Sequence, residues 1–349
     1  MNYNLEKFSN KINFGFYENQ TLLITGGTGS FGNYLVSVML DNYKLKKLII
    51  LSRDENKQYI MNEKFKNHKN FHILRFFIGD VRDLNRLDMA MRDVDYVIHA
   101  AALKHVPVAE YNPFECIKTN VYGAENIVNA AIRNNVKKVL ALSTDKATNP
   151  INLYGASKLA SDKIFVAANH LSNKKTDFSV VRYGNVVGSR GSVIPLFKKL
   201  IKENAPYLPI TDMQMTRFWI NLDDSIKFVL STIPIMIGGE IFIPRIPSAK
   251  VSDIVEVLAP GYPVQIIGIR PGEKLHEIMI TEDDARATME FEDRYIIQPL
   301  LMGNWDKNYY TKFDYKNVPD NFSYQSNLNE HWLNQSQLKS MLNNLTNDY

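Results

Sequence analysis

The stretch Ser143–Lys158 contains two pairs of side chains that could move protons. Tyr154 and Lys158 are four residues apart, so a helix that opens here would place both on one face, about a turn apart. A tyrosine must lower its pKa of ~10 by ~3 units to act as a base at neutral pH, and a close cation can supply that shift. Asp145 and Lys146 form a second acid and base nearby. Two such sets predict an enzyme whose chemistry goes beyond simple oxidation.

The strands that must position these residues are indicated by short apolar runs. Several runs are nearly continuous hydrophobic residues, as is typical of parallel strands buried on both faces. The intervals between them leave room for one crossover helix each. This alternation predicts an α/β fold, a doubly wound (Rossmann) parallel sheet. The runs are Thr21–Thr25, Lys47–Ser52, His72–Asp80, Val94–Ala101, Lys137–Thr144 and Phe178–Val186.

The first run leads into a glycine-rich turn with the spacing T-G-x-x-G-x-x-G, followed by a helical stretch. Glycines let the turn tighten and let the backbone approach a pyrophosphate at the amino end of the helix. Glycine triplets also occur in ordinary tight turns, but the strand–turn–helix context favours a dinucleotide. The residues expected to bind it here are Gly26, Gly29, Ser30, Phe31 and Gly32.

The end of the second run bears on which dinucleotide is bound. Arg53, with Ser52 and Lys57, suits the 2′-phosphate of NADP. Asp54 could instead bind the ribose hydroxyls of NAD, and Arg53 and Lys57 could be solvated surface charges. We expect NADP. Further cofactor contacts are expected at the adenine and where the cofactor lies flat, from Asp80, Val81 and Ala100.

The composition is that of an ordinary soluble globular protein, with 349 residues, 45% hydrophobic and 22% charged. A net charge of +4 without a long basic run does not predict nucleic acid as a partner and suits an anionic small molecule. The single cysteine, Cys116, excludes an internal disulfide and fits a reducing cytoplasm. No stretch approaches the ~20 apolar residues of a membrane span. We therefore expect a cytoplasmic protein without membrane attachment.

The pattern of apolar runs changes after about Gly188, which predicts a second, smaller lobe. A short helix is expected over 274–280. Near the C-terminus, Asn334 predicts a helix cap, with Leu333 and Leu338 as a hydrophobic staple. The expected organisation is an N-terminal arm over 1–20, a dinucleotide-binding domain over 21–188 with 223–245 returning to it, and a discontinuous C-terminal substrate-binding lobe over 189–222 and 246–349.

Long motifs, in order from about residue 21 to 342, resemble a known family. They include T-G-G-T-G-S-F-G, H-A-A-A-L-K-H-V-P, L-S-T-D-K-A-T-N-P-I-N-L-Y-G-A-S-K and G-I-R-P-G-E-K-L-H-E. The chain resembles the inverting UDP-N-acetylglucosamine 4,6-dehydratases of the extended short-chain dehydrogenase/reductase superfamily, the type that opens pseudaminic acid synthesis for flagellin and surface glycosylation. Dehydratases that retain configuration carry an Asp-Glu pair further upstream, whereas this chain has Asp145-Lys146. The resemblance associates this lysine with inversion at C5.

The resemblance and the proton transfers that such a reaction requires together imply four catalytic residues. Tyr154 takes the proton from the sugar O4, and Lys158 lowers the tyrosine pKa and holds the nicotinamide ribose. Lys146 removes the C5 proton, and Asp145 protonates the departing 6-hydroxyl. The product is UDP-2-acetamido-2,6-dideoxy-β-L-arabino-hex-4-ulose. As a base, Lys146 needs a pKa well below ~10.4, which the nicotinamide or Lys104 could bring about by repulsion.

The resemblance also places residues around both ligands. For UDP-N-acetylglucosamine, Arg270 would pair with the diphosphate and Glu273 would accept the ribose hydroxyls. A Pro-Gly turn with exposed charges is the structural alternative for that segment. The full substrate set is Lys104, Asn185, Val193, Thr211, Arg270 and Glu273. The remaining cofactor contacts are Lys104, Leu142, Ser143, Tyr154, Lys158, Val186 and Arg190.

Other interpretations stay open. A related inverting dehydratase or epimerase could feed capsule or lipopolysaccharide sugars, and a non-catalytic NADP(H)-binding sensor would share the nucleotide motifs. Arg217 could belong to a structural ion pair. His99 and His105 lack partners at ligand spacing, so we expect no metal. The family suggests a homo-oligomer, a dimer or hexamer.

Overall fold

The computed structural model describes residues 13–189, 191–300 and 305–343. The N-terminal arm therefore lies largely outside the described residues. Its described end, Phe14–Tyr17, forms a 3-10 helix. Tyr17 is buried and its hydroxyl donates to the Leu230 carbonyl at 2.7 Å, which anchors this segment to the body.

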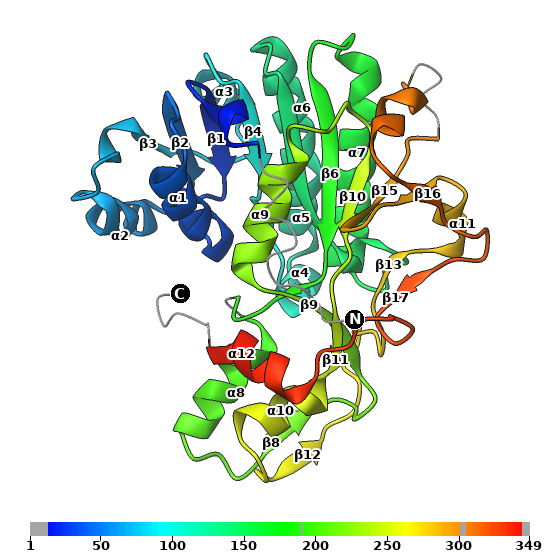
Figure 1. The fold of residues 1–349 in the computed structure, drawn as a ribbon. Coiled ribbons are helices and arrows are strands. Elements are labelled where there is room, and N and C mark those ends of the chain that lie inside the picture. Colours follow the sequence, from blue (N-terminus) through cyan, green and yellow to red (C-terminus); the bar gives the residue numbers. More distant parts are fainter. Residues whose placement is uncertain (1–12, 190, 301–304, 344–349) are drawn as a thin grey trace.

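In the described part of the chain, ten strands form one central sheet (Figure 1). Strands β1 to β6 coincide with the six apolar runs, so the prediction of a doubly wound parallel sheet is confirmed. The complete burial of β1 and β4 explains their near-continuous hydrophobic sequences. The sheet order is β16 (Lys316–Asn317), β14 (Thr288–Glu290), β15 (Arg294–Ile297), β10 (Ile241–Pro244), β6 (Asp177–Tyr183), β5 (Lys138–Thr144), β4 (Tyr96–His99), β1 (Thr21–Thr25), β2 (Lys47–Ser52) and β3 (Leu74–Ile78).

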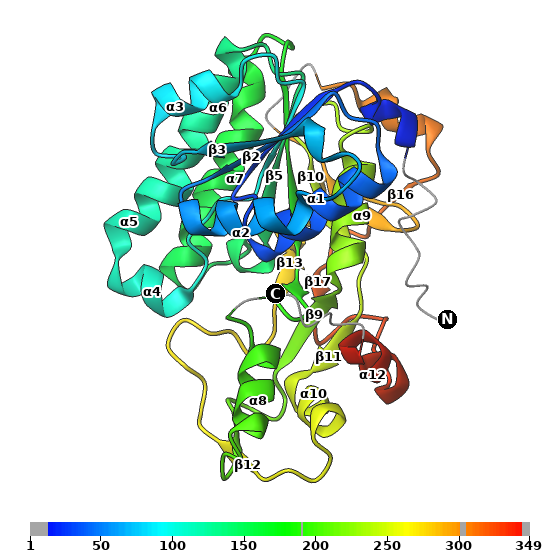
Figure 2. The ribbon, with the colours of Figure 1, turned by 90° about the vertical axis from the view of Figure 1, so that its left-hand side faces the viewer.

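Helices cover both faces of this sheet, as Figure 2 shows from the side. Helices α1, α2 and α9 lie on one face, and α3, α6 and α7 lie on the other, with α4 and α5 packed near α7. A π-helical segment joins α5 to α6. Their bounds are α1 Ser30–Asn42, α2 Glu55–Phe65, α3 Leu84–Ala90, α4 Val106–Tyr111, α5 Pro113–Ile117, the π-helix Lys118–Tyr122, α6 Gly123–Arg133, α7 Leu153–Leu171 and α9 Leu222–Thr232.

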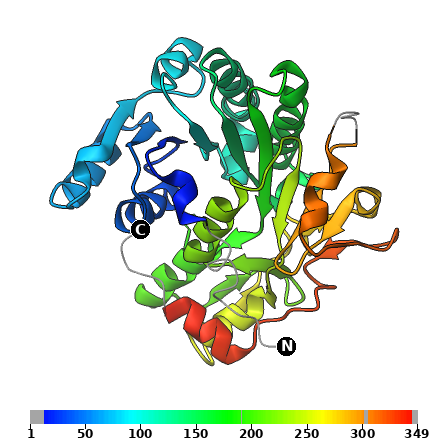
Figure 3. The same ribbon diagram turned by 45° about the horizontal axis from the view of Figure 1, so that its top comes forward.

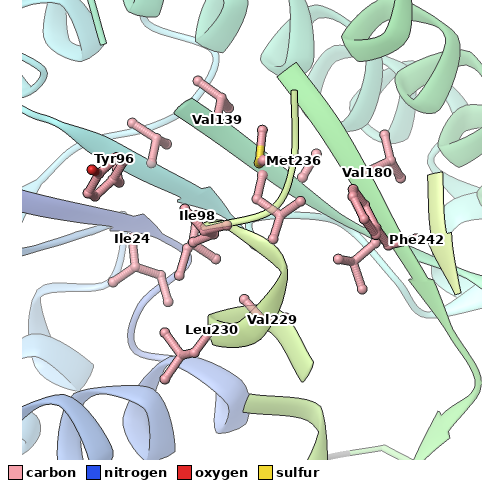
Figure 4. Close-up of a cluster of buried hydrophobic side chains, with 14 of the residues drawn as sticks. Ile24, Tyr96, Ile98, Val139, Val180, Val229, Leu230, Met236 and Phe242 are labelled. Atoms are coloured by element: carbon pink, nitrogen blue, oxygen red, sulfur yellow. The ribbon is translucent and has the colours of Figure 1, made fainter. Parts of the chain in front are cut away.

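The main core fills the space between the sheet and these helices. Figure 4 shows side chains of the central strands, such as Ile98 and Val180, beside Val229 and Leu230 of α9. All four are fully buried. Burying one such side chain contributes about 1.5–3 kcal/mol relative to leaving it exposed. This packing makes the sheet a rigid support for the loops at its carboxyl edge.

Strand β1 lies between β2 and β4, so the order of the strands reverses at this point of the sheet. The connections after β1 and β4 therefore leave in opposite directions and open a crevice at the carboxyl ends of the strands, where ligands bind in such folds. Thr25 ends β1 and His99 ends β4, and the two are paired in register. The glycine turn follows β1, and the turn that carries Asp145 and Lys146 follows β5 at the same edge of the sheet.

A second, smaller lobe faces this crevice, at the bottom of Figure 1. It has two apolar clusters of its own, which include Trp219 and Leu338 in one and Phe197 and Leu208 in the other. The elements outside the central sheet and its covering helices are β7 Asn185–Val186, α8 Val193–Lys202, β8 Leu208–Ile210, β9 Thr216–Ile220, β11 Ser248–Lys250, α10 Val251–Leu258, β12 Val264–Ile266, β13 Ile278–Ile280, α11 Glu282–Ala285, the 3-10 helix Lys307–Lys312, β17 Tyr324–Gln325 and α12 Gln335–Asn343.

Two sequence expectations about this half were wrong. Residues 288–317 were assigned to the second lobe, but β14, β15 and β16 extend the central sheet beyond β10, as Figure 3 shows in yellow to orange. The buried strand β15 covers the edge that β10 would otherwise expose. The helix expected over 274–280 is instead an irregular segment followed by β13. The cap at Asn334 is confirmed, since its Oδ1 accepts from the Gln337 amide at 2.9 Å and α12 begins one residue later.

Candidate active site

A cleft of about 790 Å³ lies at the carboxyl ends of the parallel strands, between the sheet and the second lobe. It is lined by the glycine turn, by strand ends and by the segment 267–277. Of the predicted site residues, Gly32 and Asp145 do not line it, and Arg190 lies outside the described residues. Those that line it are Gly26, Gly29, Ser30, Phe31, Ser52, Arg53, Lys57, Asp80, Val81, Ala100, Lys104, Leu142, Ser143, Lys146, Tyr154, Lys158, Asn185, Val186, Val193, Thr211, Arg270 and Glu273.

The glycine turn is packed so closely that side chains would not fit at two of its positions. A Cβ on Gly26, whose φ is +67°, would lie 2.9 Å from the Ala101 backbone. A Cβ on Gly32 would lie 2.2 Å from the Gly27 carbonyl oxygen. No side chain caps α1 at Gly29, which leaves the first-turn amides of the helix for a ligand. The turn therefore fits the pyrophosphate of a dinucleotide.

The charged residues after β2 are partly engaged with each other. Asp54 caps α2 by accepting from the Lys57 amide at 2.9 Å, and its carboxylate also pairs with the Lys57 ammonium at 2.8 Å. These contacts hold the pKa of Asp54 below its ordinary value. The Arg53 guanidinium lies 3.6 Å from the Asp80 carboxylate and is half exposed. Helix capping thus occupies Asp54, the residue that would favour NAD, and leaves Arg53 at the rim of the cleft.

Helix α7 places Tyr154 and Lys158 side by side, as their spacing predicts. The helix is capped by Asn152, whose Oδ1 accepts from the Gly155 amide at 2.7 Å. Burial raises the pKa of Tyr154 to about 12, while the Lys146 charge opposes this rise. Lys158 donates to the Leu142 carbonyl at 2.8 Å, and burial lowers its pKa. Desolvation of the buried phenol thus decides the pKa of Tyr154, which is raised overall.

Asp145 and Lys146 lie in a single 3-10 turn after β5. Asp145 is fully buried, and the Lys146 ammonium donates to its Oδ1 at 3.0 Å and to Asn185 Oδ1 at 3.3 Å. A second carboxylate, Glu277 Oε1, lies 3.4 Å from the same ammonium. Burial by itself lowers the pKa of Lys146, but Asp145 and Glu277 outweigh it and raise the pKa above its ordinary value. The two carboxylates therefore act against the lowered Lys146 pKa that was expected from the sequence.

Sequence reasoning missed Glu277, and the structural ion pair that it named for Arg217 is present. Arg217 is buried, and its guanidinium contacts Glu273 at 3.5 Å and Glu277 at 3.6 Å. It also donates to the Leu275 carbonyl at 3.0 Å. Glu277 ends the motif G-I-R-P-G-E-K-L-H-E, so the motif itself could have pointed to it. Nothing local indicated that this acid reaches Lys146, because the contact joins distant parts of the chain.

Most of the substrate residues expected from the resemblance come from the second lobe and from the segment that precedes β13, whereas Lys104 lies in the loop after β4. Arg270 and Glu273 form a two-pronged ion pair with each other, with nitrogen–oxygen distances of 3.0 and 2.9 Å. Arg270 is largely exposed at the cleft mouth. The Asn152 side-chain amide donates to the Gly272 carbonyl at 2.7 Å. The same asparagine therefore caps the catalytic helix and holds the segment that carries Arg270.

His99 has a structural partner. Its Nδ1 is 2.8 Å from Thr25 Oγ1, and burial lowers its pKa to about 3, so the ring is neutral. His105 lines the cleft. Within the described ranges, no three His, Cys, Asp or Glu side chains are placed to hold a metal ion. In the same ranges, no helix is both long enough and apolar enough to cross a membrane.

Comparisons with known proteins agree with this site. The family described as "Polysaccharide biosynthesis protein" matches residues 22–299. The chain is 57% identical to a UDP-N-acetylglucosamine 4,6-dehydratase (inverting) of Campylobacter jejuni, over 94% of this chain and 98% of that protein. It is 44% identical to a UDP-glucose 4-epimerase of Rickettsia bellii, over 84% of this chain and 86% of that protein.

Solved structures show the same fold. Pen from Bacillus thuringiensis superposes with a TM-score of 0.85 at 36% identity, covering 94% of this chain and 98% of its own. DesIV, a dTDP-glucose 4,6-dehydratase from Streptomyces venezuelae with NAD and TYD bound, superposes with a TM-score of 0.65 at 23% identity, covering 73% and 87%. The chain therefore belongs to the polysaccharide biosynthesis protein family and, within it, to the inverting UDP-N-acetylglucosamine 4,6-dehydratases.

Proposed function

We propose that this chain converts UDP-N-acetylglucosamine into the C5-inverted 6-deoxy-4-keto sugar, with NADP as its cofactor. One observation carries the proposal. Tyr154, Lys158 and Lys146 line the same cleft as the glycine turn, with Asp145 buried directly beside Lys146. The 57% identity to the Campylobacter jejuni dehydratase supports the substrate.

The chain's own residues account for the proton movements. A bound nicotinamide supplies the acceptor and donor of the hydride that leaves C4 and returns to C6. Tyr154 takes the proton from O4, and the 4-ketone that results acidifies the neighbouring C5–H. Lys146 then takes the C5 proton, and Asp145 protonates the oxygen that leaves C6 as water. Return of a proton to C5 on the opposite face gives the inverted product.

The Asp145–Lys146 geometry suits this exchange. The two groups are 3.0 Å apart, so a proton passes between them without an intermediary. Among the described residues, Asp145 Oδ2 is buried without a hydrogen-bond partner, which makes it a place where a proton can be held. Asp145 and Glu277 raise the pKa of Lys146, so the proposed base role requires that the nicotinamide cation or the sugar opposes these two charges.

The choice of NADP rests on Arg53. Its guanidinium lies at the cleft rim 3.6 Å from Asp80, whereas Asp54 is occupied by its own helix. A planar cation with several donors suits a phosphate better than a ribose hydroxyl. Lys57 lines the same part of the cleft. We further propose that the protein acts as a cytoplasmic homo-oligomer in pseudaminic acid synthesis, on the strength of the family resemblance.

Product analysis tests the activity. The purified protein is incubated with UDP-N-acetylglucosamine in deuterated water and followed by NMR. We expect a 4-keto-6-deoxy sugar with deuterium at C5, L-arabino configuration and no net accumulation of reduced nucleotide. Formation of the 4-epimer, UDP-N-acetylgalactosamine, would show an epimerase instead.

Two tyrosine variants assign the base. Tyr154→Phe should abolish turnover while cofactor binding persists. The matched control is Tyr96→Phe, which removes a phenol hydroxyl at the amino end of β4, the end of the strand away from the cleft. Its turnover should stay near that of the wild type. Wild-type rates in Tyr154→Phe would contradict the assigned role.

A further inference from the structure

Glu277 is a buried carboxylate that the reaction as described does not use. It is 2% exposed and lies in the irregular segment just before β13. Its backbone is fixed on both sides by Ser326, whose Oγ accepts from the Glu277 amide at 2.9 Å and whose amide donates to the Glu277 carbonyl at 2.8 Å. The backbone is thus held in place, and the carboxylate points toward the cleft that it lines.

The Glu277 carboxylate faces the candidate base. Its Oε1 lies 3.4 Å from the Lys146 ammonium, and its Oε2 is buried with no hydrogen-bond partner among the described residues. On the other side, Asp145 Oδ1 accepts from the same ammonium at 3.0 Å. Lys146 is therefore held between two carboxylates that come from distant parts of the chain.

A purely structural role would assign Glu277 to Arg217, whose Nε lies 3.6 Å away. Arg217 does not depend on this contact for its hydrogen bonds. Its other two nitrogens donate to the carbonyls of Thr216, Lys274 and Leu275 at 2.7, 2.9 and 3.0 Å. Glu277 Oε1 therefore forms ion pairs with both cations, and the contact with Lys146, at 3.4 Å, is the shorter of the two.

The charged and titratable groups around Lys146 come from four parts of the fold. Asp145 lies beside it in the 3-10 turn, and Arg217 comes from β9. The Lys146 charge acts to lower the pKa of Tyr154 on α7, and Lys274 lies in the same segment as Glu277. Together the two carboxylates raise the pKa of Lys146 against the opposing effects of burial and Arg217. Removal of either carboxylate therefore favours the neutral amine.

We propose that Glu277 is a positioning residue for the C5 proton transfer, which holds the Lys146 side chain in the cleft opposite Asp145. The inference rests on the proposed function, since it acts through Lys146 as base. Glu277 follows Arg270 and Glu273 in one segment, so the residues expected to bind the sugar nucleotide and the partner of the base belong to one structural unit.

The test compares wild type with Glu277→Gln, which keeps the shape of the side chain and removes its charge. Initial rates are measured against pH with UDP-N-acetylglucosamine deuterated at C5, so that proton transfer at C5 limits turnover. If Lys146 must be neutral to act, the rate rises with pH as its ammonium loses a proton. The ascending limb of the pH–rate profile should lie at lower pH in Glu277→Gln than in wild type. The expected difference is roughly 1–3 pH units, the size of shift that one close opposite charge produces.

Two further variants keep the outcome decisive. Glu277→Asp retains the charge but places it further from Lys146. The ascending limb of its pH–rate profile should therefore lie between those of wild type and Glu277→Gln. Glu273→Gln removes a carboxylate that contacts Arg217 and Arg270, and it should raise KM while leaving the limb in place. Circular dichroism melts establish that each variant is folded. If Glu277→Gln does not fold, Glu277→Asp decides by the same criterion.

The outcomes separate this inference from the proposed function. A wild-type protein that does not convert UDP-N-acetylglucosamine refutes the function itself. Wild-type turnover with an unmoved limb in the folded Glu277 variants overturns the inference alone. A limb that shifts equally in Glu273→Gln would also overturn it, because the effect would then reflect general charge in the cleft rather than the contact with Lys146.

Discussion

Gly32→Ala is expected to disrupt the dinucleotide site more than any other single methyl group added to the turn. The new Cβ would lie 2.2 Å from the Gly27 carbonyl oxygen and 2.5 Å from both the carbonyl carbon and the Cα of Gly27. Ordinary contact begins at 3.4 Å, so the turn and the first turn of α1 must separate by about 1 Å. Every atom in this contact is backbone, so a side-chain rotation cannot relieve it.

The expected loss follows from hydrogen bonds to the phosphates. A bond between an amide and a charged group contributes about 1.5–3 kcal/mol. A shift of about 1 Å is enough to break one or two of them, which corresponds to roughly 100-fold weaker binding. Isothermal titration of NADP measures this loss, and urea unfolding first establishes the fraction of Gly32→Ala that is folded, because overpacking also costs about 1–3 kcal/mol of stability.

Gly29→Ala is the matched control from the same turn. Its Cβ would meet the Gly26 carbonyl oxygen at 3.2 Å, a contact that a displacement of a few tenths of an ångström relieves. Gly29 has a φ of −73°, which any residue can adopt. Binding should weaken by less than ~10-fold. Equal losses for Gly29→Ala and Gly32→Ala, or wild-type affinity in Gly32→Ala, would refute the steric reasoning.

Three further predictions follow from single contacts. Arg53→Ala should weaken NADP binding by roughly 10–100-fold and NAD binding far less, and equal effects in parallel titrations would contradict a 2′-phosphate role. Asn152→Ala removes the α7 cap and the bond to Gly272, so unfolding free energy should fall by about 1 kcal/mol and KM should rise; an unchanged KM would limit Asn152 to capping. Burial lowers the pKa of His99 to about 3 from an ordinary 6.5. Below pH 6.5 the unfolded chain therefore binds a proton that the folded chain does not, and His99 should reduce the unfolding free energy by about 2 kcal/mol between pH 7 and pH 5. Urea titrations of wild type and His99→Gln measure this, and identical pH slopes would show that His99 is not responsible.

The sequence predicted the nucleotide-binding half of the fold almost completely, because its signals are local. Runs such as Lys47–Ser52 are continuous hydrophobic strands, and each is followed by a helix that can be recognised from its own residues. The glycine turn likewise lies within one strand–turn–helix unit. The placement of Tyr154 beside Lys158 required only that α7 begin before the tyrosine, and Asn152 supplies its cap.

The sequence failed where packing between distant segments decides the structure. Strand β15 is four residues long, and its place in the central sheet comes from antiparallel pairing with β10, more than fifty positions earlier. The segment 274–277 has enough apolar and charged alternation for a short helix, yet Arg217 donates to the Lys274 and Leu275 carbonyls, which are therefore not used in helical hydrogen bonds. The effect of Glu277 on the pKa of Lys146 was missed for the same reason, because Glu277 reaches it from this segment.

Several of these non-local contacts lie in one place, beside the proposed catalytic residues. The turn after β5 and the segment before β13 are joined by Asn152 to the Gly272 carbonyl, by Lys274 to the Thr148 carbonyl and by Lys146 to Glu277. The first two contacts span 120 and 126 positions of the chain. We call this set of contacts between the turn after β5 and the segment before β13 the seam. The turn carries the proposed acid and base, and the segment carries residues expected to hold the sugar nucleotide. Binding and proton transfer therefore depend on the same set of contacts, so a substitution that loosens the seam should impair both together, whereas loss of a single catalytic group should impair turnover alone.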